Sequence, residues 1–168
     1  MFVASMNPCP CGFYGSKEKE CTCSPQAIQR YMGKISGPLL DRIDIQIEVT
    51  AVKYQKLETE EEAENSSKIK ERVNKARRIQ QERYKENGIY SNAELTPKLV
   101  SKYCKLDKEA KAILQNAFEK LGLSARAHSR ILKVARTIAD LDEEENINVN
   151  HIAEAIQYRS LDKKYWNN

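Results

Sequence analysis

The sequence predicts a mainly α-helical protein, in which a helical bundle follows a remnant of an α/β unit made of two short strands and one short helix. Apolar residues recur with helical spacing from residue 66 onward, whereas strand-like patterns occur only at residues 2–6 and 43–49. A strongly acidic stretch separates the N-terminal region with strand-like patterns from the region with helical spacing. We therefore divide the chain into residues 1–52, a linker at 53–65, and residues 66–168.

The first part has the composition of the end of an α/β unit. An apolar run at 2–6 leads into Asn7, and residues 43–49 alternate apolar and polar side chains as a half-buried strand does. Ser24 can begin a short helix that runs to about residue 32. Two strands and one helix bury too little apolar surface to fold alone. We therefore expect the chain to be the trailing part of a larger protein.

A long basic helix is predicted for residues 66–86. Lys and Arg crowd its surface, and Asn87 with Gly88 ends it, because both residues adopt the left-handed conformation found at helix C-termini. The linker before it is a solvated hinge in our interpretation. The apolar positions of the helix are Ile69, Val73, Ala76 and Ile79, and the acidic residues of the linker are Glu58, Glu60, Glu61, Glu62 and Glu64.

Shorter helices complete the predicted bundle, and each has a boundary signal. Apolar stripes within residues 110–121 and 127–138 predict its core. The boundary signals are Thr96 with Pro97, Asp107, Ser124 and Asn148 at helix starts, and Gly122 at a helix end.

Composition points to a soluble cytoplasmic protein. No apolar run approaches the roughly eighteen residues that a membrane span needs, and the first residues lack the pattern of an export signal. The net charge of +4 is mild, and basic side chains alternate with acidic ones. This balance permits a polyanionic partner without requiring one.

Four of the five cysteines lie within fifteen residues, as two Cys-x-Cys pairs. In the reducing cytosol such a cluster favours a metal over disulfides, and four thiolates suit tetrahedral zinc. The alternative is a set of reduced thiols in a mobile loop, since the Cys-x-Cys spacing is tighter than is usual for zinc. Cys104 lies apart and is predicted to be a packed core side chain. The four candidate ligands are Cys9, Cys11, Cys21 and Cys23.

Several motifs together resemble one known family. The segment Met6-Asn7-Pro8-Cys9-Pro10-Cys11-Gly12 is the first of them, and the similarity extends over nearly the whole chain. It is similar to the C-terminal part of the ComM (YifB) proteins, which are magnesium-chelatase-like AAA+ ATPases. The other matching segments are residues 28–31, 35–44, 123–127, 130–141, His151 and 154–159.

The resemblance implies that the chain contains the end of an AAA+ nucleotide-binding core followed by a helical lid. It also implies that the whole protein forms a homo-oligomeric ring, expected to be a hexamer. This ring would use ATP with Mg and act on DNA in branch migration. Asn7 matches the sensor-1 position, which orients the attacking water. Arg42 matches the arginine finger, which acts on a neighbouring subunit's nucleotide. Arg126 matches sensor 2 on the lid helix.

Each of these residues also has a plainer interpretation. Asn7 can simply end a strand before a turn. Arg42 can form an exposed ion pair with a nearby aspartate, Asp41 or Asp44. Arg126 lies in a cationic stripe with Arg130 and Lys133, and such stripes commonly face solvent.

The chain lacks the phosphate-binding loop of an ATPase. Gly33-Lys34 is its only Gly-Lys pair, with Ile28 where the first glycine of the motif belongs and Ile35 where the hydroxyl belongs. We therefore expect these 168 residues not to hydrolyse ATP by themselves.

Two other functions stay open at this point. One is an ATPase subunit of a magnesium-chelatase complex that inserts metal into a porphyrin. The other is a non-enzymatic, zinc-dependent interaction module. The basic helix at 66–86 could contact DNA phosphates, but a solvated face has the same composition, and we prefer that interpretation.

Overall fold

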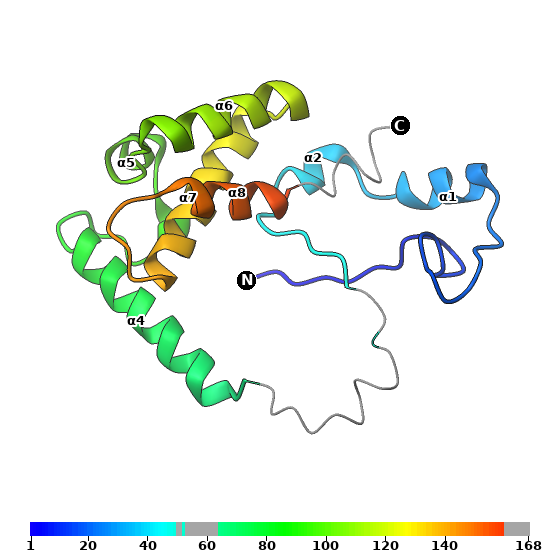
Figure 1. Cartoon of the computed structure of the whole chain (residues 1–168), viewed down its shortest axis with the longest axis horizontal. Helices are drawn as coiled ribbons and strands as arrows, with labels where there is room; N and C mark the ends of the chain where they lie inside the picture. Colours follow the sequence, from blue (N-terminus) through cyan, green and yellow to red (C-terminus); the bar gives the residue numbers. More distant parts are fainter. Residues whose placement is uncertain (50–51, 53–63, 160–168) are drawn as a thin grey trace. The chain divides into compact units, whose positions relative to one another are not determined.

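A computed structural model describes residues 1–49, 52 and 64–159, and it divides into two compact units. The first unit covers residues 1–43 and the second covers residues 44–159. Four of the acidic hinge residues, Glu58 and Glu60 to Glu62, lie outside the described residues. The two units are described separately (Figure 1).

The first unit consists of an irregular N-terminal segment, a cysteine-containing loop and two short helices. Helix α1 (Pro25–Met32) begins where the sequence predicts, because the Ser24 hydroxyl accepts a hydrogen bond from the Ala27 N–H at 3.3 Å. Helix α2 (Gly37–Leu40) is a single turn that the sequence does not predict. Met32 and Leu40 are the buried side chains of these helices.

The two predicted strands are wrong for this structure. Residues 2–6 and 43–49 have no strand partner among the described residues, and most of their apolar side chains are exposed, by 42% at Met6 and by up to 83% at Val49. Alternation of apolar residues produces a strand only when a neighbouring strand supplies hydrogen bonds and a covering face. The α/β remnant is therefore not confirmed. The described residues contain one isolated β-bridge, between Leu106 and Ile147.

The second unit is the predicted helical bundle (Figure 1). It begins with the long basic helix α4, which ends close to the predicted Asn87-Gly88 boundary. The elements are α4 (Ser66–Tyr84), the 3-10 turn η1 (Asn92–Glu94), α5 (Pro97–Tyr103), α6 (Lys108–Leu121), α7 (Ala125–Leu141) and α8 (Val149–Gln157). The mainly helical fold class is thereby confirmed.

Helix α7 is the central element of this bundle. It packs against α4, η1, α5 and α8, and α8 in turn packs against α6. Its apolar stripe is buried at Ile131, Ala135 and Ala139, alongside Ile152 of α8 and Leu114 of α6. The periodicity predicted for residues 127–138 therefore marks the core correctly.

Most predicted caps are present. The Asp107 carboxylate accepts from the Ala110 N–H at 2.7 Å, and the Ser124 hydroxyl accepts from the Ala127 N–H at 3.1 Å. Asn148 forms a reciprocal capping box with His151, whose Nδ1 accepts from the Asn148 N–H at 3.1 Å. Gly122 takes the left-handed conformation, with φ of 53°. Thr96 precedes α5 without a side-chain capping bond.

Helix α4 buries the face that its apolar residues predict, but only over the C-terminal half of the helix. Ala76, Gln80 and Tyr84 are buried, whereas Ile69 and Val73 are 41% and 42% exposed. A polar side chain can replace an apolar one at a buried position only when its hydrogen bonds are satisfied. The Gln80 side chain meets this condition by accepting from the backbone N–H of Asn92 at 3.2 Å.

A buried carboxylate organises the contact between α4 and α7. Asp140 of α7 is fully buried and accepts hydrogen bonds from Arg83 of α4, at 2.9 Å to Oδ2, and from Nε of Arg136, at 3.1 Å. The Asn92 amide also donates to it, at 2.9 Å. Arg136 donates further to the carbonyls of Glu144 and Glu145 at 2.6 and 2.7 Å. The network therefore joins α4, η1, α7 and the loop before α8.

No helix in the described part of the chain has both the length and the apolar composition needed to cross a membrane.

We predict that Asp140→Asn destabilises the second unit by about 3 kcal/mol or more, because it leaves the buried Arg136 and the largely buried Arg83 without their anionic partner. Urea denaturation followed by circular dichroism measures the change. Glu71→Gln is the matched control, since Glu71 is an exposed residue of α4, and its expected effect is below about 0.5 kcal/mol. Equal stability of Asp140→Asn and the unsubstituted chain would contradict this account.

Candidate functional site

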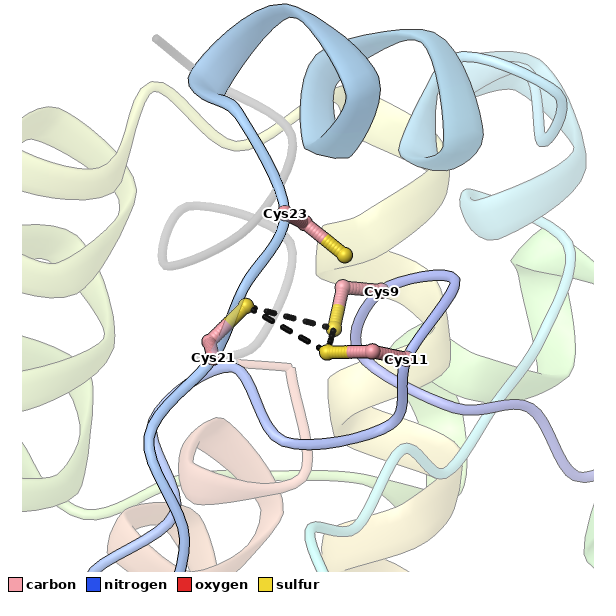
Figure 2. Close-up of side chains that lie close together, drawn as sticks. All are labelled: Cys9, Cys11, Cys21 and Cys23. Atoms are coloured by element: carbon pink, nitrogen blue, oxygen red, sulfur yellow. Dashed lines mark hydrogen bonds between the residues drawn. The ribbon is translucent and has the colours of Figure 1, made fainter.

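The four clustered cysteines converge in space (Figure 2). Their sulfur atoms all lie within 4.8 Å of one another. Cys9 Sγ is 3.4 Å from Cys11 Sγ and 3.7 Å from Cys21 Sγ, and the Cys11 and Cys21 sulfurs are 3.5 Å apart. Disulfide sulfurs lie about 2.05 Å apart, so these are free thiols brought together without cross-linking.

These separations fit a tetrahedral metal. Zinc–sulfur bonds of about 2.3 Å place the sulfur atoms of a tetrahedral site ~3.8 Å apart. The observed spacing is close to that value, and the four ligands come from two short segments that face each other across one loop. Cys9 is fully buried and the other three are half-buried, so the group is shielded but accessible.

The thiols differ in acidity. The backbone N–H of Phe13, helped by neighbouring sulfurs, lowers the pKa of Cys11 to about 6, which favours its thiolate. The backbone around Cys23 favours the thiolate of Cys21, but desolvation and the adjacent sulfurs outweigh it and raise the Cys21 pKa to about 12. The Cys11 thiolate thus lies beside Cys21 and Cys23, whose pKa values are raised by desolvation and by the adjacent sulfurs, so a cation bound here would displace protons.

A tight turn holds the first two cysteines. The Gly12 N–H donates to the Cys9 carbonyl at 3.0 Å, and Gly12 has a φ of +84°, which L side chains rarely adopt. The Tyr14 N–H donates to Cys9 Sγ at 3.3 Å. Asn7 is exposed and lies beside this turn, since a methyl group added at Gly12 would lie 3.7 Å from Asn7 Nδ2. The predicted sensor residue and the cysteine loop are therefore neighbours.

Arg42 follows α2 and is exposed. Its Nη1 donates to the Pro38 carbonyl at 2.6 Å, within the same turn. The alternative ion pair with Asp44 is not formed, because Asp44 pairs with Arg130 instead. The guanidinium of Arg42 is thus held at the surface by one backbone contact.

Of the three cationic residues in the stripe on α7, two form polar contacts with other described residues and one does not. Arg130 pairs with Asp44, and Lys133 Nζ donates to the Ala93 carbonyl at 2.9 Å. Arg126 lies in the first turn of α7, is exposed, and makes no hydrogen bond or ion pair with any described residue. Arg130 and Lys133 thus have partners, and both of these contacts lie at the exposed surface.

The structure brings together the four cysteines and Asn7, all in the first unit, which also carries Arg42. Arg126 belongs to the second unit. Cys104 is a buried core residue, as predicted, and burial raises its pKa to about 11. The Arg83, Asp140 and Arg136 network was not predicted. The only signal for it in the sequence is the polar residues that interrupt the apolar faces of α4 and α7.

Family models match both parts of the chain. The model described as magnesium chelatase, subunit ChlI C-terminal, matches residues 63–159, which is more than half of the chain. The model of magnesium chelatase, subunit ChlI, matches residues 1–57.

Two relatives match nearly the whole chain. The competence protein ComM of Haemophilus influenzae is 44% identical over 160 residues, which cover 95% of this chain and 30% of that protein. The protein YifB of Escherichia coli is 40% identical over 162 residues, which cover 96% of this chain and 31% of YifB. The chain thus spans less than a third of the length of these relatives. The resemblance to ComM and YifB is confirmed, and the chain belongs to the family of the magnesium chelatase subunit ChlI.

Proposed function

We propose that this chain completes the nucleotide site of a ring-forming AAA+ ATPase that acts on DNA. In this proposal Asn7 is sensor 1, Arg42 is the arginine finger and Arg126 is sensor 2. The observation that carries the proposal is the state of Arg126, which is exposed and without a partner in the described residues while both other cations of its stripe are engaged.

Helix α7 would hold the backbone of Arg126 in a fixed position. Ser124 caps the helix start, and the adjacent Ala127 is fully packed into the core, so the backbone of the first turn is held on both sides of Arg126. The same helix end carries a partial positive charge, which favours a nearby phosphate. A cation in this position can bind the nucleotide of its own subunit.

Arg42 would act across a subunit boundary. An arginine supplied by a neighbouring subunit stabilises the charge that develops on the transferred phosphoryl group. Its side chain is exposed, and its one backbone contact, to Pro38, can be exchanged for a stronger bond to phosphate. This role requires a homo-oligomeric ring, and a hexamer is the assembly that we propose.

Asn7 would orient the attacking water. Its amide supplies both a donor and an acceptor, which is what a bound water needs for orientation. The position of the amide depends on the adjoining turn at Gly12, and therefore on the cysteine loop. ATP and Mg would be bound by a phosphate-binding loop that this chain does not contain.

Zinc in the four-cysteine cluster would have a structural role. The first unit has two short helices and few buried side chains in its described residues, so a tetrahedral metal would supply much of its cohesion. By closing the loop behind Asn7, the metal would also hold that amide in place. Cys9, Cys11, Cys21 and Cys23 are the four ligands in this proposal.

DNA is the proposed substrate of the whole protein. The support comes from the competence protein ComM, which is similar to this chain over almost all of the chain's length. We assign no DNA contact to α4, because two of its basic residues already form exposed ion pairs, Arg72 with Glu64 and Lys75 with Glu143. A magnesium-chelatase subunit is the competing function, and ATPase activity that duplex or branched DNA fails to stimulate would favour it.

Arg42→Ala in the full-length protein should reduce ATP turnover by about a thousandfold while sparing ATP binding, because a finger acts in the transition state. Arg126→Ala should weaken ATP binding, turnover or both. Steady-state hydrolysis and nucleotide-binding titrations separate these effects.

The matched control for both variants is Arg78→Ala, since Arg78 is an exposed arginine of α4 with no assigned role. It should hydrolyse ATP at the unsubstituted rate. Normal turnover in the Arg42 variant would remove the finger from the proposal, and normal binding together with normal turnover in the Arg126 variant would remove sensor 2.

Zinc should bind at one ion per chain and stabilise the first unit. Replacing Cys11 and Cys21 with Ser should abolish binding, whereas Cys104→Ala should retain it, because Cys104 lies in the core of the second unit. Atomic emission spectroscopy measures the stoichiometry, and thermal melting with and without a chelator measures the stabilisation. A purified chain that binds no zinc at micromolar concentration would refute the site. Complete unfolding of both units on chelation would favour the zinc-dependent interaction module.

A further inference from the structure

A cavity of 290 Å³ lies in the second unit, at the ends of α4 and α5 and beside α7. Its lining is strongly basic, with four cationic side chains and one carboxylate. The residues that matter here are Arg83, Lys102, Tyr103, Lys105, Arg136 and Glu145. None of them belongs to the proposed nucleotide site or to the cysteine cluster.

Two arginines form the buried wall of this cavity, and they share a single anion. Arg83 and Arg136 both bind the Asp140 carboxylate, and their side chains are only 16% and 2% exposed. One negative charge opposing two positive charges leaves an excess of positive charge in a poorly solvated place. Such an excess is costly unless a further anion offsets it.

The arginines retain hydrogen-bond capacity. The bidentate contact to Asp140 takes two of the five N–H groups of Arg83. Arg136 is held more fully, by Asp140 and by the carbonyls of Glu144 and Glu145. Burial lowers the pKa of Arg136, which shows how weakly its charge is solvated. Both guanidinium groups are thus positioned before any ligand arrives.

Two lysines line the exposed side of the cavity. Lys102 lies over the ring of Tyr103, with Nζ 4.8 Å from the ring centre. The side-chain ammonium groups of Lys102 and Lys105 form no ion pair or hydrogen bond with a residue that the structure describes. Glu145 is the carboxylate of the lining, and it is exposed. The lining therefore remains net positive after Asp140 and Glu145 are both counted.

We propose that this cavity binds a phosphate group, with Arg83 and Arg136 at its base and Lys102 and Lys105 at its mouth. Guanidinium groups recognise phosphate oxygens through paired hydrogen bonds, and lysines add charge with freedom of position. The volume admits a phosphate with part of an attached sugar. The phosphate comes either from a free nucleotide or from a nucleic-acid backbone, since both offer the same oxygens.

The test uses the 168-residue chain with three probes: inorganic phosphate, ATP and a short DNA duplex. Binding is followed by NMR, through the side-chain N–H signals of arginine, and by calorimetry at several salt concentrations. The double variant Lys102→Gln/Lys105→Gln should weaken phosphate binding about tenfold and lower the salt dependence of binding by about two ion equivalents. Both lysines are exposed, so the variant should fold normally.

The matched control is Lys108→Gln/Lys111→Gln, which removes the same charge from α6 at exposed positions outside the cavity lining. Its binding should equal that of the unsubstituted chain. Saturable binding of inorganic phosphate or ATP identifies a free nucleotide as the source, and binding of the duplex alone identifies a nucleic-acid backbone. Absence of binding to all three probes, or equal loss in both double variants, would overturn the proposal. Neither result would bear on Asn7, Arg42 or Arg126.

Discussion

The second unit depends on one buried carboxylate held between two arginines. Asp140 sits at the last turn of α7, and its partners Arg83 and Arg136 come from α4 and α7. Because a charge cannot leave water unless its hydrogen bonds are replaced, this contact dictates which face of α4 meets α7. It also draws in η1 through Asn92. Apolar side chains supply most of the buried surface between the helices, and the ionic network selects one arrangement of those helices.

Different parts of helix α7 consequently contribute to the ionic network, to the apolar core and to the exposed surface. Its C-terminal half carries the ionic network, and its middle carries the apolar core around Ile131 and Ala135. Its first turn packs Ala127 into the core and exposes Arg126. A long helix clamped at its far end transmits that rigidity to its first turn, so a cation there is positioned without a rigid loop. The role that we propose for Arg126 at one end of α7 would therefore depend on burial at the other end.

The first unit follows a different principle. Its described residues have little secondary structure, and its most ordered feature is a loop whose four sulfur atoms meet. A bound metal would form four strong bonds to cysteine sulfurs from two short segments, and these bonds would stabilise the unit in place of a large apolar core. Asn7 packs beside this loop and Arg42 follows α2, so both proposed nucleotide contacts of this unit are attached to short, locally determined structure.

Local signals were sufficient to place the starts of α1 in the first unit and of α6, α7 and α8 in the second. Ser24, Asp107, Ser124 and Asn148 all cap helices because an N-cap bond involves only residues two or three positions away. The cysteine spacing likewise indicated a cluster. Strands at 2–6 and 43–49 were predicted wrongly, because pairing requires a partner elsewhere in the fold, whatever the alternation of the segment itself.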